Sequence, residues 1–227
     1  TPWHIREAAV HIIEKGITSY TSNQGLMQLR ESICNYLEDR FQIKYEPKTQ
    51  IVVTVGASEG IDIACRALIS PGDEVLIVEP SYVSYKPCIN MAGGVPVVIE
   101  TKAENQFRLT PDELKAAITP KTKILILPYP NNPTGGIMER EDLEAIAPIL
   151  IENDIFVISD EIYGELTYGK KHVSIASIPG MYERTVVLNG FSKAFSMTGW
   201  RLGYAAGPSE VIKYMNRIHQ YIIMCAP

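Results

Sequence analysis

The hydrophobic and polar positions of the chain follow two periods, one typical of helices and one typical of strands. Residues 28–38 carry apolar side chains at the spacing of a single helix face, namely Leu29, Ile33, Tyr36 and Leu37. Residues 51–55 form a short β-branched run, the pattern of a buried strand, and residues 58–68 return to the helical period. The pattern therefore predicts helices and strands in alternation.

The same alternation continues through the rest of the chain. Further strands are predicted at residues 74–78, 95–99, 123–127, 155–159 and 186–188, with helices at 111–118 and 140–152. Strands and helices that alternate at this interval form right-handed βαβ crossovers. The predicted fold class is therefore α/β, with a mostly parallel sheet that carries helices on both faces. No internal repeat, low-complexity tract or linker interrupts the pattern, which favours one domain.

Composition and charge narrow the class of protein. A chain of 227 residues with 46% hydrophobic content can bury a substantial core. No apolar run approaches the length of a membrane span, and the net charge of −5 is spread along the chain. We therefore expect neither a membrane nor a nucleic acid as a partner. The first residues carry no apolar segment of the signal-peptide type, so the expected location is the cytoplasm.

Neither the cysteines nor the histidines are spaced like metal ligands. Cys34, Cys65, Cys88 and Cys225 form no Cys-x-x-Cys pair and lie among apolar or helical neighbours. This setting favours reduced, buried thiols. The four histidines show no metal-ligand spacing either, so no metal site is expected.

Lys193 is the most informative residue of the sequence. It follows the predicted strand at 186–188 after a few small residues, and open α/β sheets bind their ligands just beyond the carboxyl ends of strands. Small residues let the backbone approach a ligand closely, and Arg201 can offer a forked cation to a phosphate. A lysine with ordinary neighbours would more often be a solvated surface charge. These neighbours indicate a functional amine.

Lys193 belongs to one of four motifs that follow one another along the chain. They are VGASE at 55–59, NNPTG at 131–135, SDEIY at 159–163 and GFSKAFSMTGWRLG at 190–203. In this order they resemble the motifs of the class I/II aminotransferases, pyridoxal phosphate (PLP) enzymes of fold type I. The resemblance covers essentially the whole chain. It implies PLP as the cofactor and Lys193 as the residue that forms a Schiff base with it.

The resemblance gives the acidic motif a role at the cofactor ring. Asp160 directly follows the strand at 155–159, where a buried carboxylate needs a partner. By resemblance it pairs with the pyridine nitrogen of PLP, so that the ring can accept electrons from the substrate. Tyr163 and Asn132 are implied as hydrogen-bond partners of the ring's phenolic oxygen. Taken without the resemblance, Asp160 could cap a turn or pair with a structural cation, and Tyr163 could be ordinary core.

The resemblance also implies how the phosphate is held. Ala57 and Ser58 lie between a predicted strand and a helix, where backbone N–H groups and the helix dipole attract anions. Arg201 adds charge-assisted hydrogen bonds, and Ser192 adds a hydroxyl. The chain departs from part of the family here, because some members carry the serine at the position of Gly190 and others at the position just before the lysine.

Two tyrosines complete the implied site. Tyr82 matches the aromatic position that stacks on the PLP ring, although a tyrosine there could also simply pack against its neighbours. Tyr20 resembles the tyrosine that reaches across the dimer interface to the phosphate of the neighbouring subunit. An exposed aromatic loop is the alternative for Tyr20. The resemblance thus implies a homodimer.

The activity implied by the resemblance is transfer of an amino group between an L-amino acid and a 2-oxo acid, with Lys193, Asp160 and Tyr163 as catalytic residues. Residues 1–227 are expected to be the large PLP-binding domain, without the family's N-terminal segment and C-terminal small domain. By itself such a fragment is expected to be inactive or nearly so. Two alternatives stay open, a PLP-dependent carbon–sulfur lyase of the same fold and a non-catalytic PLP-binding module.

Overall fold

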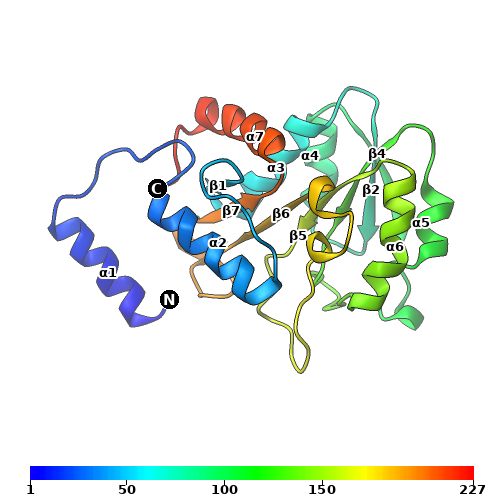
Figure 1. The fold of residues 1–227 in the computed structure, drawn as a ribbon, viewed down its shortest axis with the longest axis horizontal. Coiled ribbons are helices and arrows are strands. Elements are labelled where there is room, and N and C mark those ends of the chain that lie inside the picture. The colour runs from blue at the N-terminus through cyan, green and yellow to red at the C-terminus, as the bar shows by residue number, and fades with distance from the viewer.

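A seven-stranded sheet forms the centre of the computed structural model, which describes residues 1–227 (Figure 1). The strands along the chain are β1 (Ile51–Thr54), β2 (Glu74–Glu79), β3 (Val95–Glu100), β4 (Thr122–Leu127), β5 (Phe156–Asp160), β6 (Thr185–Gly190) and β7 (Gly203–Ala206). Their order in space is β1-β7-β6-β5-β4-β2-β3. The pairs among β2 to β6 are parallel, and β7 runs antiparallel to both of its neighbours. The prediction of a mostly parallel α/β sheet is confirmed.

Helices connect these strands. The α-helices are α1 (Trp3–Glu14), α2 (Met27–Phe41), α3 (Gly56–Leu68), α4 (Tyr85–Met91), α5 (Pro111–Ala117), α6 (Arg140–Glu152) and α7 (Ser209–Ile222). Short 3-10 helices occur at Ala103–Asn105, Ile175–Ser177, Tyr182–Arg184 and Thr198–Trp200. None of the helices has both the length and the apolar character needed to cross a lipid bilayer.

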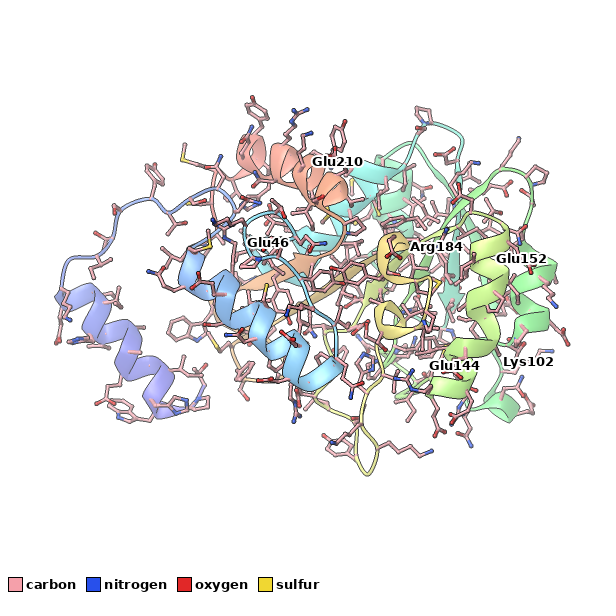
Figure 2. All side chains as sticks on the ribbon, in the orientation of Figure 1. Glu46, Lys102, Glu144, Glu152, Arg184 and Glu210 are labelled. Atoms are coloured by element: carbon pink, nitrogen blue, oxygen red, sulfur yellow. The ribbon has the colours of Figure 1, made fainter.

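Alternate residues of the strands pack against different helices, as the pleat of a sheet requires. In β4, Ile124 and Ile126 belong to an apolar cluster with residues of α3, α4 and α7. Leu125 and Leu127 belong to a second cluster with residues of α5 and α6. A third cluster joins α2 to β1 and β7. The core thus lies on both faces of the sheet, while charged residues such as Glu144, Glu152 and Glu210 occupy the outer surface (Figure 2).

The predicted helices and strands are all present, with ends that differ by a few residues, but four elements were missed. β7 reads Gly-Tyr-Ala-Ala, without the β-branched residues that mark the other strands. α4 is short and contains Pro87. α7 does show a helical period, because it buries Ile212, Met215 and His219 on one face. α1 buries no residue and lies apart from the sheet at the left of Figure 1.

The cysteines are free thiols, and the expectation of burial holds for three of them. Cys34, Cys65 and Cys88 are buried, and burial raises the pKa of the Cys65 thiol to about 12. Cys225 is only half-buried, which corrects the prediction for that residue. It follows the end of α7, outside any helix or strand.

Candidate active site

The carboxyl ends of several strands surround one cavity of about 170 Å³. The residues of its wall follow β1, β2, β4, β5 and β6, as expected for a ligand site of an α/β sheet. Of the residues predicted from the sequence, the cavity brings together Ala57, Ser58, Tyr82, Asn132, Asp160, Tyr163, Ser192, Lys193 and Arg201. Tyr20 lies outside it, in the loop between α1 and α2, and its side chain is 82% exposed.

One end of the cavity is acidic and buried. Asp160 is the last residue of β5 and only 6% exposed. Its Oδ2 accepts a hydrogen bond of 2.7 Å from the Tyr85 hydroxyl, and its Oδ1 accepts one of 3.3 Å from the backbone N–H of Ile162. Burial raises the pKa of Asp160, while these two hydrogen bonds act in the opposite direction. The carboxylate therefore depends on its donors to stay ionised.

Tyr85 is a further residue of the cavity wall, and the sequence did not predict it. It begins α4, lines the cavity and is 2% exposed. Burial next to Asp160 raises the pKa of Tyr85 well above its ordinary value, so its hydroxyl remains a donor. Its ring also meets that of Tyr82 edge to face, at 5.7 Å between centroids. The available signal was the three-residue spacing of the two tyrosines, which puts them on one side of a helical turn.

Glu161 supports the same end from behind the pocket wall. It is fully buried, and its Oε1 accepts hydrogen bonds from the hydroxyls of Ser159 at 2.8 Å and Ser174 at 2.6 Å. Its Oε2 lies 2.8 Å from Nε2 of His172. Its backbone N–H donates to the carbonyl of Leu188 in β6. These bonds fix the turn that carries both Asp160 and Tyr163.

Lys193 lies between the two ends of the cavity, in a tight turn that follows β6. The turn is closed by backbone hydrogen bonds from Ser196 to Lys193 and from Met197 to Ser192. The Nζ atom of Lys193 lies 5.6 Å from the centroid of the Tyr163 ring. Ser192 is buried and Lys193 is half-buried, and both line the cavity. The turn therefore contributes a short hydroxyl and a long amine to the same site.

The other end of the cavity is cationic and more open. It is formed by the first turn of α3, which begins at Gly56 with φ +74°, and by the exposed Arg201. The Arg201 guanidinium is so near that a Cβ on Gly56 would collide with its Nη2. Arg201 itself has φ +53° and donates from Nη1 to the carbonyl of Thr198 at 2.9 Å. A left-handed arginine costs about 1–2 kcal/mol, and such strain persists mostly at functional positions.

Asn132 stands at the rim of the cavity. It is exposed and follows β4 in a loop whose turn is held by Asn131, which accepts hydrogen bonds from the backbone and hydroxyl of Thr134. Thr198 also lines the cavity, and the sequence offered no signal for it beyond its place before Arg201. The loop after β4 therefore contributes an exposed amide to the wall of the cavity.

The chemistry of these groups fits PLP. Free helix N–H groups and a guanidinium suit a phosphate, a buried carboxylate suits a protonated ring nitrogen, and an amine between them suits an aldehyde. Glycine at position 56 lets the Arg201 guanidinium lie against the N-terminus of α3, because a Cβ there would collide with it.

Comparison with known proteins gives consistent matches. The family model described as "Aminotransferase class I and II" matches residues 1–227. The chain is 51% identical to the putative aminotransferase YugH of Bacillus subtilis, with 100% of this chain and 59% of that protein covered. It is 46% identical to aromatic-amino-acid aminotransferase 2 of Thermococcus litoralis, with 99% and 58% covered.

Solved structures agree with these sequences. The aromatic aminotransferase from Pyrococcus horikoshii OT3 has a TM-score of 0.98 at 46% identity, with 100% of this chain and 61% of that chain covered. The aspartate aminotransferase from Thermus thermophilus with maleate has a TM-score of 0.96 at 39% identity, with 100% and 58% covered. The sheet is thus that of a fold type I PLP enzyme.

The chain belongs to the class I and II aminotransferases, the PLP-dependent family that its motifs resemble. It spans less than two thirds of the curated relatives it matches, with 59%, 58% and 57% of three of them covered.

Proposed function

We propose that the protein containing this chain is a PLP-dependent aminotransferase that moves an amino group between an L-amino acid and a 2-oxo acid. The observation that carries this proposal is that Lys193, Asp160 and Arg201 line one cavity at the carboxyl edge of the sheet. Asp160 comes from a different segment of the sequence than Lys193 and Arg201, and each of the three groups suits a different part of the cofactor. The names of the relatives support the same reaction class.

Bound PLP supplies an aldehyde that condenses with amines and a ring that accepts electrons from the α-carbon of the substrate. Asp160 holds the proton on the ring nitrogen through a charge-assisted hydrogen bond. Tyr85 donates to the second carboxylate oxygen and so keeps Asp160 ionised and correctly oriented. In this buried position the carboxylate is weakly screened, which makes its effect on the ring large.

Lys193 has two tasks in this proposal. Its amine would hold the cofactor covalently through the aldehyde. Its Nζ, when free, would move a proton at the α-carbon of the substrate as general base and acid. Tyr163, whose ring lies beneath Nζ, and Asn132 donate hydrogen bonds to the phenolic oxygen of the ring.

The remaining residues hold and orient the cofactor. Ala57 and Ser58 offer backbone N–H groups of the first turn of α3, which have no partners within the helix. Arg201 and the hydroxyl of Ser192 complete the set around the phosphate, and Tyr82 stacks on the ring.

Residues 1–227 form the large PLP-binding domain in this proposal, and the full enzyme is a homodimer. The exposed Tyr20 and α1, which buries none of its residues, support a second copy, because Tyr20 lies outside the cavity of its own chain. In this proposal Tyr20 contacts the phosphate of the partner. The four unpaired cysteines fit a reducing compartment, and we assign the enzyme to the cytoplasm.

The experiment is a transamination assay of the full-length protein with PLP, 2-oxoglutarate and a panel of amino acids. We expect a 2-oxo acid from at least one donor, with formation of pyridoxamine phosphate in the half-reaction. Pyruvate, ammonia and a thiol from sulfur amino acids would instead identify a carbon–sulfur lyase. PLP binding without either reaction would identify a non-catalytic module. The 227-residue chain, assayed beside the full-length protein, should bind PLP and transaminate weakly or not at all.

A further inference from the structure

A pair of ionisable side chains, His219 fully buried and Glu59 partly buried, joins α7 to the first turns of α3, next to the proposed phosphate end of the cavity. His219, on α7, is fully buried, and its Nδ1 lies 2.7 Å from Oε1 of Glu59 on α3. The other carboxylate oxygen of Glu59, Oε2, accepts a hydrogen bond of 2.6 Å from the backbone N–H of Val55. Neither Glu59 nor His219 lines the cavity, so neither can touch a ligand there.

The bond to Val55 closes the turn that holds the phosphate-binding groups. Val55 precedes the first helical residue of α3, and Glu59 lies four residues further on. The Glu59 side chain therefore folds back over the turn and encloses residues 56–58 in a hydrogen-bonded ring. Those residues carry the free N–H groups that point out of the helix. Their orientation depends on the position of Val55, and hence on Glu59.

His219 determines where the Glu59 carboxylate lies. A carboxylate only accepts hydrogen bonds, so Nδ1 of His219 carries the proton between them. The other ring nitrogen, Nε2, is buried and has no hydrogen-bond partner in the chain. Burial of this nitrogen without a partner costs folding free energy, which a purely apolar side chain at position 219 would avoid. The hydrogen bond to Glu59 offsets that cost.

The pair also answers an electrostatic conflict. A carboxylate in the first turn of a helix is favourable for the helix dipole but repels a phosphate bound at the same N-terminus. Arg201 lies against Gly56 and lines the cavity, whereas His219 bonds to Glu59 and neither of these two lines it. The imidazole thus binds the negative charge of Glu59 outside the cavity wall, while the cation of Arg201 faces the cavity.

We propose that Glu59 and His219 are positioning residues for the phosphate of PLP, acting through the 56–58 turn. The inference rests on the proposed function, because it concerns the cofactor of that reaction. It predicts that the pair contributes to binding of PLP but not to binding of pyridoxal, which has the same ring and aldehyde and no phosphate.

The test is a titration of the full-length apoprotein with PLP and with pyridoxal, followed by absorbance, in the parent and in three variants. Glu59→Ala removes the hydrogen-bond acceptor for the backbone N–H of Val55. It should weaken the binding of PLP about tenfold and leave the binding of pyridoxal nearly unchanged. Glu59→Gln keeps an oxygen acceptor for Val55 and should restore most of the preference for PLP. His219→Phe leaves Glu59 without its partner and should also reduce the preference.

The matched control is Asp62→Ala, which removes another carboxylate of α3. The Asp62 side chain forms a salt bridge with Arg66 and does not bond to the 56–58 turn. Its preference for PLP should equal that of the parent. Equal weakening of PLP and pyridoxal in Glu59→Ala, or an unchanged preference, would overturn the inference. If Glu59→Ala does not fold, His219→Phe decides in the same way. A parent protein that binds neither compound contradicts the proposed function itself, which keeps the two failures apart.

Discussion

The two ends of the cavity are built by different means. At the ring end a single carboxylate, Asp160, is buried at 6% exposure and held by two donors. At the other end, where we propose that the phosphate binds, the available groups are backbone N–H groups of α3 and the exposed Arg201. A charge in a low-dielectric setting acts strongly on a reacting ring, whereas exposed groups act through affinity and are screened by salt. Changes at the ring end should therefore lower turnover, and changes at the phosphate end should lower cofactor affinity.

The largest effect is expected from Asp160→Ala in the full-length enzyme. Loss of the carboxylate removes the group that holds the proton on the ring nitrogen, and we expect the single-turnover rate with an amino acid to fall at least about a thousandfold. Asp160→Glu should be intermediate. PLP affinity should change much less than the rate. Near-normal turnover of Asp160→Ala would leave Asp160 with only a structural role.

Arg201→Gln tests the opposite end. A charge-assisted hydrogen bond contributes about 1.5–3 kcal/mol, so the dissociation constant of PLP should rise about ten- to a hundredfold, with a smaller change in the rate of the saturated enzyme. Added salt should lower the PLP affinity of the parent more than that of Arg201→Gln. The parent keeps the exposed cation, whose attraction for the phosphate is screened by salt, and the variant does not. Equal salt dependence in both proteins would contradict a phosphate role for Arg201.

Gly203→Ala addresses the support of the phosphate cradle. A Cβ on Gly203 would lie 2.6 Å from both the backbone N of Ala57 and the backbone C of Gly56, and backbone atoms yield little. Overpacking of this kind costs about 1–3 kcal/mol, so we expect a lower free energy of unfolding and weaker PLP binding. Gly199→Ala is the control in a neighbouring turn, because its Cβ would meet nothing within 4 Å. Identical denaturation curves for the two variants would rule this explanation out.

The smallest effect is expected from Tyr85→Phe, which removes one hydroxyl from the ring end. Turnover should fall about three- to tenfold, the range of a single hydrogen bond. The lost donor lowers the pKa of Asp160 in the parent, so this pKa rises further in the variant. Because Asp160 must be ionised to pair with the ring, turnover is lost as the pH falls through its pKa. That loss should shift to higher pH in Tyr85→Phe.

Tyr45→Phe is the matched control for Tyr85→Phe. Tyr45 is also buried, but its hydroxyl has no hydrogen-bond partner and its ring stacks on Tyr182, in the cluster with α2. Its pH profile should coincide with that of the parent. A shift of equal size in both variants would show that Tyr85 acts only through packing.

The sequence was sufficient to locate those site residues whose side-chain chemistry and place after a strand both point to a ligand site. Asp160 and Lys193 could be located because each follows an apolar strand, and strand ends meet at one edge of the sheet. Tyr85 and Glu161 could not, because their partners are set by how α4 and the segment around Ser174 pack against the sheet. The pair of Glu59 and His219 joins positions 160 residues apart, and no local pattern reveals it.

The most direct test of the account is the position of the covalent bond to PLP. The full-length protein is incubated with PLP, reduced with borohydride, digested with trypsin and mapped by mass spectrometry. We expect the phosphopyridoxyl group on Lys193, in a peptide that spans residues 185–201 because trypsin no longer cleaves after the modified lysine. Modification of any other lysine, with Lys193 unmodified, would contradict the assignment of this cavity as the active site.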